Sequence, residues 1–320
     1  TPGYENSLFF SPRLRAYAES QAAELVDSYG LRGRDVVELG CGDGGFLALL
    51  AAAGARCTGY DPSAAASTVT AEGVTIIARD FSATAGPLSA DLVVCRHVLE
   101  HVEAPRDFLA AVRTSLPRGA QAGVFFEVPN ALATLRDLAI WDLVYEHPSY
   151  FWQGSLASVF ARAGYRVEHI EESFEGQFLT IRARLTESPA PPYLPETPAL
   201  AWLRVRLDAF AAAYRNKRDF WSAELERLAA AGKRAVIWGA GSKGVMFLNA
   251  FAACAALTAA VDVNPRKHGL YIAGSGHPIV PPEALSTDPP STVILMNPAY
   301  ENEVATRCRQ LRLDVDILCA

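Results

Sequence analysis

Two glycine-rich turns decide the fold of this chain: Val36-Val37-Glu38-Leu39-Gly40-Cys41-Gly42-Asp43-Gly44-Gly45 and Val236-Ile237-Trp238-Gly239-Ala240-Gly241-Ser242-Lys243-Gly244. Each turn follows an apolar run typical of a strand and precedes an apolar stretch typical of a helix. Glycines in a strand–turn–helix context predict a nucleotide-type site, because the backbone can approach a ligand closely there. The two turns differ in their charges, and this difference carries the functional prediction.

The first turn is preceded by an acid, Glu38, which ends the expected strand. A pyrophosphate would sit against the helix N-terminus, and a carboxylate at the mouth of the turn would repel it. The same carboxylate suits a ligand with a cationic head. S-adenosylmethionine carries an ammonium and a sulfonium and no phosphate, so we expect it as the cofactor.

Downstream strand ends agree with this prediction. A second short strand ends at Asp61, about 20 residues after Gly40, where a ribose-binding acid is expected. A third strand, Val74 to Ile77, is followed by Asp80-Phe81, a carboxylate and an aromatic ring that can bind adenine, and a fourth runs from Asp91 to Cys95. The residues predicted to bind the cofactor are Glu38, Gly40, Cys41, Gly42, Asp61, Asp80, Phe81, Arg96 and His97. The motifs V-V-E-L-G-C-G-D-G, G-Y-D-P-S and L-E-H-V, spread over roughly residues 30–185, resemble those of class I S-adenosylmethionine-dependent methyltransferases.

Composition excludes several other classes. The 320 residues are 50% hydrophobic and 20% charged, which is ordinary for a globular α/β protein with room for two domains. No apolar run is long enough to span a bilayer, and the net charge of −6 argues against nucleic acid as a partner. The six cysteines form no C-x-x-C pair, so we expect no disulfide framework and a reducing, cytoplasmic compartment. We expect a monomer or a homodimer.

The order of elements predicts two domains. Alternating strands and helices indicate a Rossmann-like methyltransferase domain over residues 1–187, closed by an antiparallel hairpin, Tyr165–Ile170 and Gln177–Leu185. An insertion, Ala131 to Trp152, follows the fifth strand. A proline-rich linker and a long helix occupy residues 188–232, and a smaller Rossmann-like α/β domain occupies residues 233–320.

The second turn belongs to this smaller domain. No acid precedes its glycines, and Lys243 lies within it, so it favours a phosphate. Asp262 ends the next expected strand, and Asn297 and Tyr300 follow the one after that. The residues predicted to bind substrate are Tyr4, Glu100, Lys243, Asn297 and Tyr300.

Two histidines are candidates for the chemistry. His147 lies in the insertion, and His101 lies just beyond the fourth strand, so both could flank one pocket. Methyl transfer requires alignment of a nucleophile and usually removal of its proton, and histidine suits that role near neutral pH. The predicted catalytic residues are His147, Glu146, His101 and Tyr145. Structural roles for both histidines remain an alternative. A metal site from His101, Glu146 and His147 is not expected, because no ligand pair has i,i+4 spacing.

The whole chain resembles the C-methyltransferases that act on nucleotide-linked keto-deoxysugars in natural product biosynthesis. The segments E-H-P-S-Y-F, G-A-G-S-K-G-V-M-F-L-N, V-D-V-N-P-R-K-H-G and N-P-A-Y carry the resemblance. It implies that the tail domain helps to bind the nucleotide diphosphate and that His147, assisted by a tyrosine, removes the proton α to a ketone. The family usually has Y-H-E-H where this chain has Val144-Tyr145-Glu146-His147, and it carries a zinc module that this sequence, beginning at Thr1, does not show.

We therefore predict S-adenosylmethionine-dependent methylation of a small specialised metabolite, with C-methylation of a nucleotide-linked keto-deoxysugar as the leading hypothesis. O- or N-methylation of a non-sugar molecule is the first alternative. An NAD-dependent oxidoreductase or epimerase using the second turn is a weaker one, because of Glu38 and the small size of the tail domain. A binding protein without catalysis ranks last, since the first turn shows no loss of the residues expected to bind S-adenosylmethionine.

Overall fold

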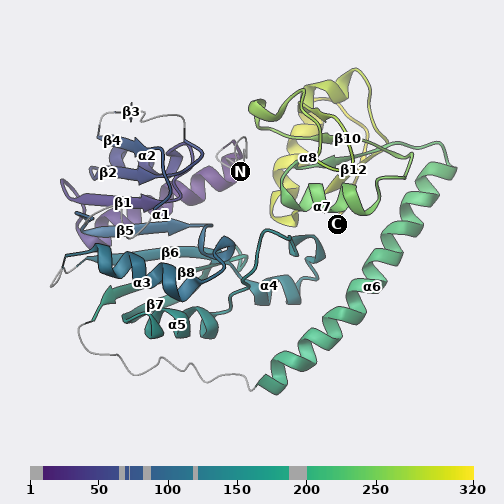
Figure 1. Ribbon diagram of the computed structural model, residues 1–320. Helices are drawn as coiled ribbons and strands as arrows, with labels where there is room; N and C mark the ends of the chain where they lie inside the picture. Colours follow the sequence, from purple (N-terminus) through teal and green to yellow (C-terminus); the bar gives the residue numbers. More distant parts are fainter. Residues whose placement is uncertain (1–9, 65–68, 72, 82–87, 118–121, 187–199) are drawn as a thin grey trace. The chain divides into compact units, whose positions relative to one another are not determined.

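The computed structural model describes residues 10–64, 69–71, 73–81, 88–117, 122–186 and 200–320, and their contacts form two compact units (Figure 1). The first unit contains residues 14–133 and 145–200. The second contains residues 134–144 and 201–320 together with the described residues before Leu14. This division differs from the expected boundaries, because residues 134–144, from the insertion after the fifth strand of the first domain, contribute to the second unit.

The first unit is built on an eight-stranded sheet in the order β3-β4-β2-β1-β5-β6-β8-β7. Strands β1, β2, β4, β5 and β6 are parallel, whereas β3 pairs antiparallel with β4, and β8 pairs antiparallel with β6 and β7. The turn between β7 and β8 confirms the predicted hairpin. The strands are β1 (Asp35–Leu39), β2 (Arg56–Tyr60), β3 (Val69–Ala71), β4 (Val74–Ile77), β5 (Leu92–Arg96), β6 (Gly123–Pro129), β7 (Tyr165–Ser173) and β8 (Phe178–Leu185).

Helices cover this sheet and bury its central strands. Nearly every residue of β1, β5 and β6 is buried, as expected for parallel strands with both faces covered. The helical segments are α1 (Pro12–Tyr29), α2 (Gly45–Ala52), the 3₁₀ turn η2 (Leu99–His101), α3 (Pro105–Ser115), α4 (Ala131–Arg136) and α5 (Gln153–Arg162). Helix α2 follows β1 directly, which places its N-terminus at the carboxyl edge of the sheet.

The second unit has a five-stranded, all-parallel sheet in the order β11-β10-β9-β12-β13. Its strands are β9 (Ala235–Trp238), β10 (Leu257–Val261), β11 (Ile279–Val280), β12 (Thr292–Leu295) and β13 (Asp316–Cys319). Its helical segments are η3 (Ile140–Asp142), α6 (Leu200–Ala230), α7 (Ser242–Ala250), η4 (Pro265–Lys267), η5 (Pro282–Ser286), η6 (Pro298–Tyr300) and α8 (Glu301–Gln310). The second Rossmann-like domain is therefore confirmed.

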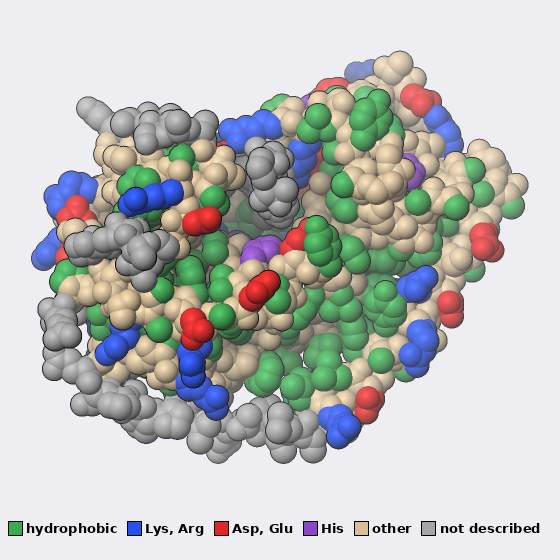
Figure 2. Space-filling view, in the orientation of Figure 1, with side chains coloured by type: hydrophobic (Ala, Val, Ile, Leu, Met, Phe, Trp, Pro, Cys, Tyr) green, Lys and Arg blue, Asp and Glu red, His purple; other side chains and the backbone are tan. Residues whose placement is uncertain are grey.

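Two aromatic residues show why residues 134–144 belong to this unit. Trp141 is buried, and its ring lies 4.8 Å from that of Phe247 on α7. Trp221 of α6 lies 5.2 Å from the same phenylalanine, so η3 and α6 share one core. The buried apolar residues of α6 in this core are Phe210, Trp221, Leu225 and Leu228. The exposed face of the helix carries both acidic and basic side chains (Figure 2). In the part of the chain that the structure describes, no helix is long and apolar enough to cross a membrane.

Candidate active site

The turn after β1 is held open by glycines at positive φ. Gly40 has φ 73° and Gly42 has φ 56°. A Cβ on Gly40 would lie 2.2 Å from Val98 Cγ2, so no other residue fits there without displacing the chain that follows β5. The Gly40 amide donates to the Tyr60 carbonyl at 2.7 Å. Because β1 lies between β2 and β5, this turn occupies the switch point where open α/β sheets bind ligands.

Asp61 fixes the same turn from the end of β2. Its Oδ2 accepts the Gly42 amide at 2.7 Å, and its Oδ1 accepts the amide and hydroxyl of Ser63 at 2.8 and 2.6 Å. Among the described residues Oδ2 accepts only the Gly42 amide, so it retains a second lone pair for a ribose hydroxyl. Cys41, also predicted to bind the cofactor, is buried with its Sγ against Gly59, and packing accounts for this position.

Glu38 is the strongest sign of a cationic ligand. The residue is only 3% exposed, and its Oε2 is buried with no hydrogen-bond partner among the described residues. Burial raises the pKa of the Glu38 carboxyl to about 8, against the opposing charge of Arg96, and Asp61 adds to the rise. A buried acceptor without a partner is costly, and an ammonium or sulfonium would relieve that cost. The residues around this turn therefore fit S-adenosylmethionine.

An aromatic wall stands at the ends of β2 and β4. The Phe81 ring meets Tyr60 edge-on with centroids 6.4 Å apart, and it meets Phe108 at 6.1 Å. Asp80 beside it is exposed. An exposed carboxylate next to a partly buried ring is the arrangement predicted for an adenine site.

Arg96 and His97 have partners that the sequence did not predict. Both contact Glu127 of β6, which is 0% exposed: Arg96 donates from Nη2 at 2.9 Å, and His97 Nε2 lies 3.0 Å from the same oxygen. Gln21 and the Tyr17 hydroxyl, both from α1, donate to the other oxygen. Burial favours the neutral carboxyl, but Arg96 and His97 outweigh it and hold the pKa of Glu127 far below its usual range.

This network changes the interpretation of Arg96 and His97. Both side chains contact Glu127 of β6, which helix α1 also contacts, and the Arg96 guanidinium lies 4.1 Å from the Phe46 ring centroid. Any contact with the cofactor remains a prediction. One feature of the sequence could have indicated this network: Glu127 is an acid inside the apolar run Val124-Phe125-Phe126-Glu127-Val128. An acid in such a run is a buried charge that needs a partner.

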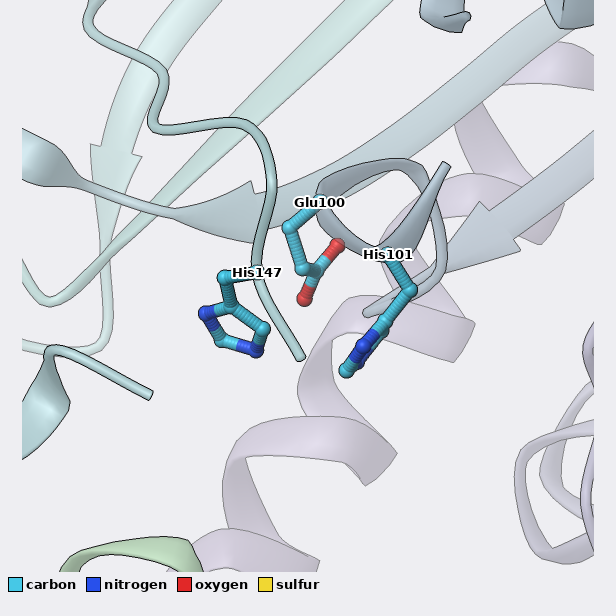
Figure 3. A group of neighbouring side chains, drawn as sticks. All are labelled: Glu100, His101 and His147. Carbon is cyan, nitrogen blue, oxygen red and sulfur yellow. The ribbon is translucent and has the colours of Figure 1, made fainter. Parts of the chain in front are cut away.

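Two distant segments bring both candidate histidines together beside a buried acid (Figure 3). Glu100 and His101 come from η2, and His147 comes from the irregular segment before α5. The imidazole rings of His101 and His147 lie 4.6 Å apart at 81°. Glu100 is 2% exposed, its Oε2 has no hydrogen-bond partner among the described residues, and one ligand atom of each of the three lies within 4.8 Å of the others.

The tautomer of neutral His101 follows from one contact. Its Nδ1 lies 3.0 Å from the Glu146 carbonyl oxygen, which can only accept, so Nδ1 carries the proton and the lone pair is on Nε2. Glu146, one of the predicted catalytic residues, thus contacts His101 through its backbone carbonyl. Tyr145 is 88% exposed, and its hydroxyl hydrogen-bonds Glu146, which raises the pKa of the tyrosine. A direct catalytic role for Tyr145 has no support from this geometry.

The lysine of the second turn pairs with a carboxylate, which would compete with a phosphate for it. Lys243 Nζ lies 2.9 Å from Asp142 Oδ2 of η3. Asn297 Oδ1 accepts the Ala299 amide at 3.0 Å and so caps η6, while burial raises the pKa of Tyr300 to about 12, with Glu303 adding to it. Tyr4, also predicted to bind substrate, lies outside the described residues.

Asp262, which follows strand β10, contacts this second turn. Its Oδ2 accepts the Ala240 amide at 2.9 Å and lies 3.4 Å from Lys267 Nζ, and its Oδ1 accepts the Asn264 amide at 2.8 Å. These contacts hold the glycine turn and neutralise the acid. Asp262 is thus paired with a cation, whereas no ion pair of Asp61 occurs among the described residues.

Comparisons with known proteins agree with the two-unit architecture. Residues 14–170 match the family described as a methyltransferase domain, and residues 204–314 match the C-methyltransferase C-terminal domain. The chain is 30% identical over 305 residues to the C-methyltransferase NovU of Streptomyces niveus, covering 87% of this chain and 70% of NovU.

Other similarities cover a smaller share of the chain. A ubiquinone biosynthesis O-methyltransferase of Burkholderia multivorans is 34% identical over 115 residues, or 33% of this chain and 49% of that protein, so the chain matches about half of its length. The crystal structure of magnesium protoporphyrin IX methyltransferase from Synechocystis PCC 6803 with bound S-adenosylhomocysteine covers 58% of this chain and 90% of that one, at 18% identity and a TM-score of 0.43.

Proposed function

Because the chain belongs to the C-methyltransferase family represented by NovU, and is thus an S-adenosylmethionine-dependent methyltransferase, we propose that it methylates a carbon α to the ketone of a nucleotide-linked keto-deoxysugar. In this proposal His147 is the general base. The observation that carries it is the convergence of His147, His101 and the buried Glu100 just beyond β5.

The cofactor end of the site is provided by the ends of β1 and β2. Glu38 would hold the cationic methionine head, Asp61 the ribose, and the glycine turn the backbone contacts. When bound, S-adenosylmethionine supplies an electrophilic methyl group on a sulfonium centre. Arg96 and His97 pair with Glu127, whereas no ion pair of Glu38 occurs among the described residues.

The acceptor carbon must lose a proton before it can attack the methyl group. A hydrogen α to a ketone is weakly acidic, so its removal must be assisted by a positioned group. His147 would take this proton, and the C–H electron pair would pass into an enolate, the carbon nucleophile that methyl transfer requires. Glu100 lies where its carboxylate stabilises the imidazolium formed on either histidine.

The second unit would hold the nucleotide diphosphate. Lys243 and the N-terminal amides of α7 form a cationic edge, with Asn297 following the neighbouring strand β12. Asp142 now pairs with Lys243, so a diphosphate would take the place of this carboxylate.

The test is hydrogen exchange in deuterated water. The protein is incubated with a nucleotide-linked 4-ketosugar and S-adenosylhomocysteine, so that enolisation is observed without methyl transfer. We expect exchange at the α-carbon, reduced about 10²–10⁴-fold in His147→Gln and unchanged in the control His169→Gln, an exposed histidine on β7. No exchange by the unmodified protein, or methylation of an oxygen once S-adenosylmethionine is supplied, would contradict the proposal.

A further inference from the structure

We propose that Glu100, His101 and His147 form a binding site for a borderline divalent cation such as Zn²⁺. The three donors come from two segments, η2 and the irregular segment before α5, and their ligand atoms lie within 4.8 Å of one another (Figure 3). Two imidazoles and one carboxylate are a donor set that zinc takes when a coordination position stays open, and Mg²⁺ prefers oxygen ligands alone.

Burial and hydrogen bonding favour a cation at this point. Glu100 is 2% exposed, and its Oε2 has no hydrogen-bond partner within the described ranges, so a positive ion would compensate a buried charge. His101 donates Nδ1–H to the Glu146 carbonyl, which leaves the Nε2 lone pair for a metal. Orientation of a ligating histidine through its other nitrogen is the usual outer-shell arrangement.

Only small movements are needed to close the site. Ligands about 2.1 Å from a tetrahedral ion lie about 3.4 Å from one another. His101 is exposed and His147 is partly exposed, so both rings can rotate toward Glu100 without repacking the core. His97 opposes the binding of a cation at this site. Its Nδ1 lies 3.7 Å from Glu100 Oε1, and its positive charge would weaken binding.

Binding is tested on the full chain by equilibrium dialysis against Zn²⁺ and by the visible spectrum after Co²⁺ substitution. We expect one ion per chain in the unmodified protein and in two controls, His169→Gln and Cys319→Ser, the latter because Cys319 is an exposed thiol. His101→Gln and Glu100→Gln should bind Zn²⁺ at least about tenfold more weakly. Retained binding of S-adenosylmethionine shows that a variant is folded.

The proposal is overturned if His101→Gln binds Zn²⁺ like the unmodified protein, or if Cys319→Ser abolishes binding. One consequence rests on the proposed function: an ion on His147 occupies the lone pair of the base, so Zn²⁺ should inhibit turnover and a chelator should restore it. If Zn²⁺ raises turnover while its binding depends on His101, the site stands and the role of His147 as base fails.

Discussion

Replacing Glu38 with glutamine should stabilise the first unit, although Glu38 is predicted to bind the cofactor. The carboxyl is buried, its Oε2 has no partner among the residues described, and its pKa is raised to about 8. A carboxyl whose pKa is higher in the folded state than in the unfolded state holds its proton more tightly when folded. The stability that it contributes is therefore full at low pH and is lost as the pH rises through 4.5 toward 8.

The size of the effect follows from this pKa difference. Relative to a side chain that never ionises, the wild-type cost is about 1 kcal/mol at pH 5, about 3 kcal/mol at pH 7 and about 5 kcal/mol at pH 9. Glutamine keeps the shape and cannot ionise, so the variant should gain these amounts. At pH 7 the melting temperature of the first unit should rise by about 6–12 °C.

Differential scanning calorimetry without ligand, at several pH values, measures this gain. The transition of the first unit is the one that S-adenosylmethionine shifts in the wild-type protein. A matched control is Glu127→Gln on β6, where the buried carboxylate is paired with Arg96 and His97. Its pKa is lowered, so removal of its charge should cost about 3–5 kcal/mol at pH 7, with the opposite sign.

The reasoning would be refuted if Glu38→Gln melted at or below the wild-type temperature at pH 9, or if its gain did not change with pH. The same variant should bind S-adenosylmethionine more weakly, because an amide cannot pair with the ammonium. Undiminished affinity would remove Glu38 from the cofactor site.

Three further outcomes are expected. S-adenosylmethionine binding at pH 7 should release a proton, because Glu38 ionises against the cation; calorimetry in buffers of different ionisation enthalpy detects this, and equal apparent enthalpies would contradict it. Asp61→Asn should weaken S-adenosylmethionine by about 1–3 kcal/mol in a titration, since it disturbs both the ribose acceptor and the Gly42 contact, and full affinity would exclude that role. Asp142→Asn should free Lys243 and tighten a nucleoside diphosphate by up to about tenfold, and an unchanged Kd would show that Lys243 lies outside the substrate site.

The sequence by itself determined the architecture and the cofactor. Strand–turn–helix patterns, the glycines at Gly40 and Gly42, and an acid at Glu38 are local features, and local features set backbone conformation and the charge at a strand end. The parallel order of strands then places Glu38 and Asp61 at one edge of the sheet. This is why the class of enzyme could be predicted from one sequence.

Tertiary structure alone decided which charged groups pair. Glu127 meets Arg96 and Gln21 from separate elements, Asp142 reaches Lys243 across a hundred residues of chain, and residues 134–144 pack in the core of the second unit. Neither spacing nor composition encodes such pairings, because a buried charge can be satisfied by any partner that the packing brings near. The sequence could name His101, His147 and Glu100 separately, but only the fold joins them into one cluster, since side-chain distances depend on how η2 and the segment before α5 are packed together.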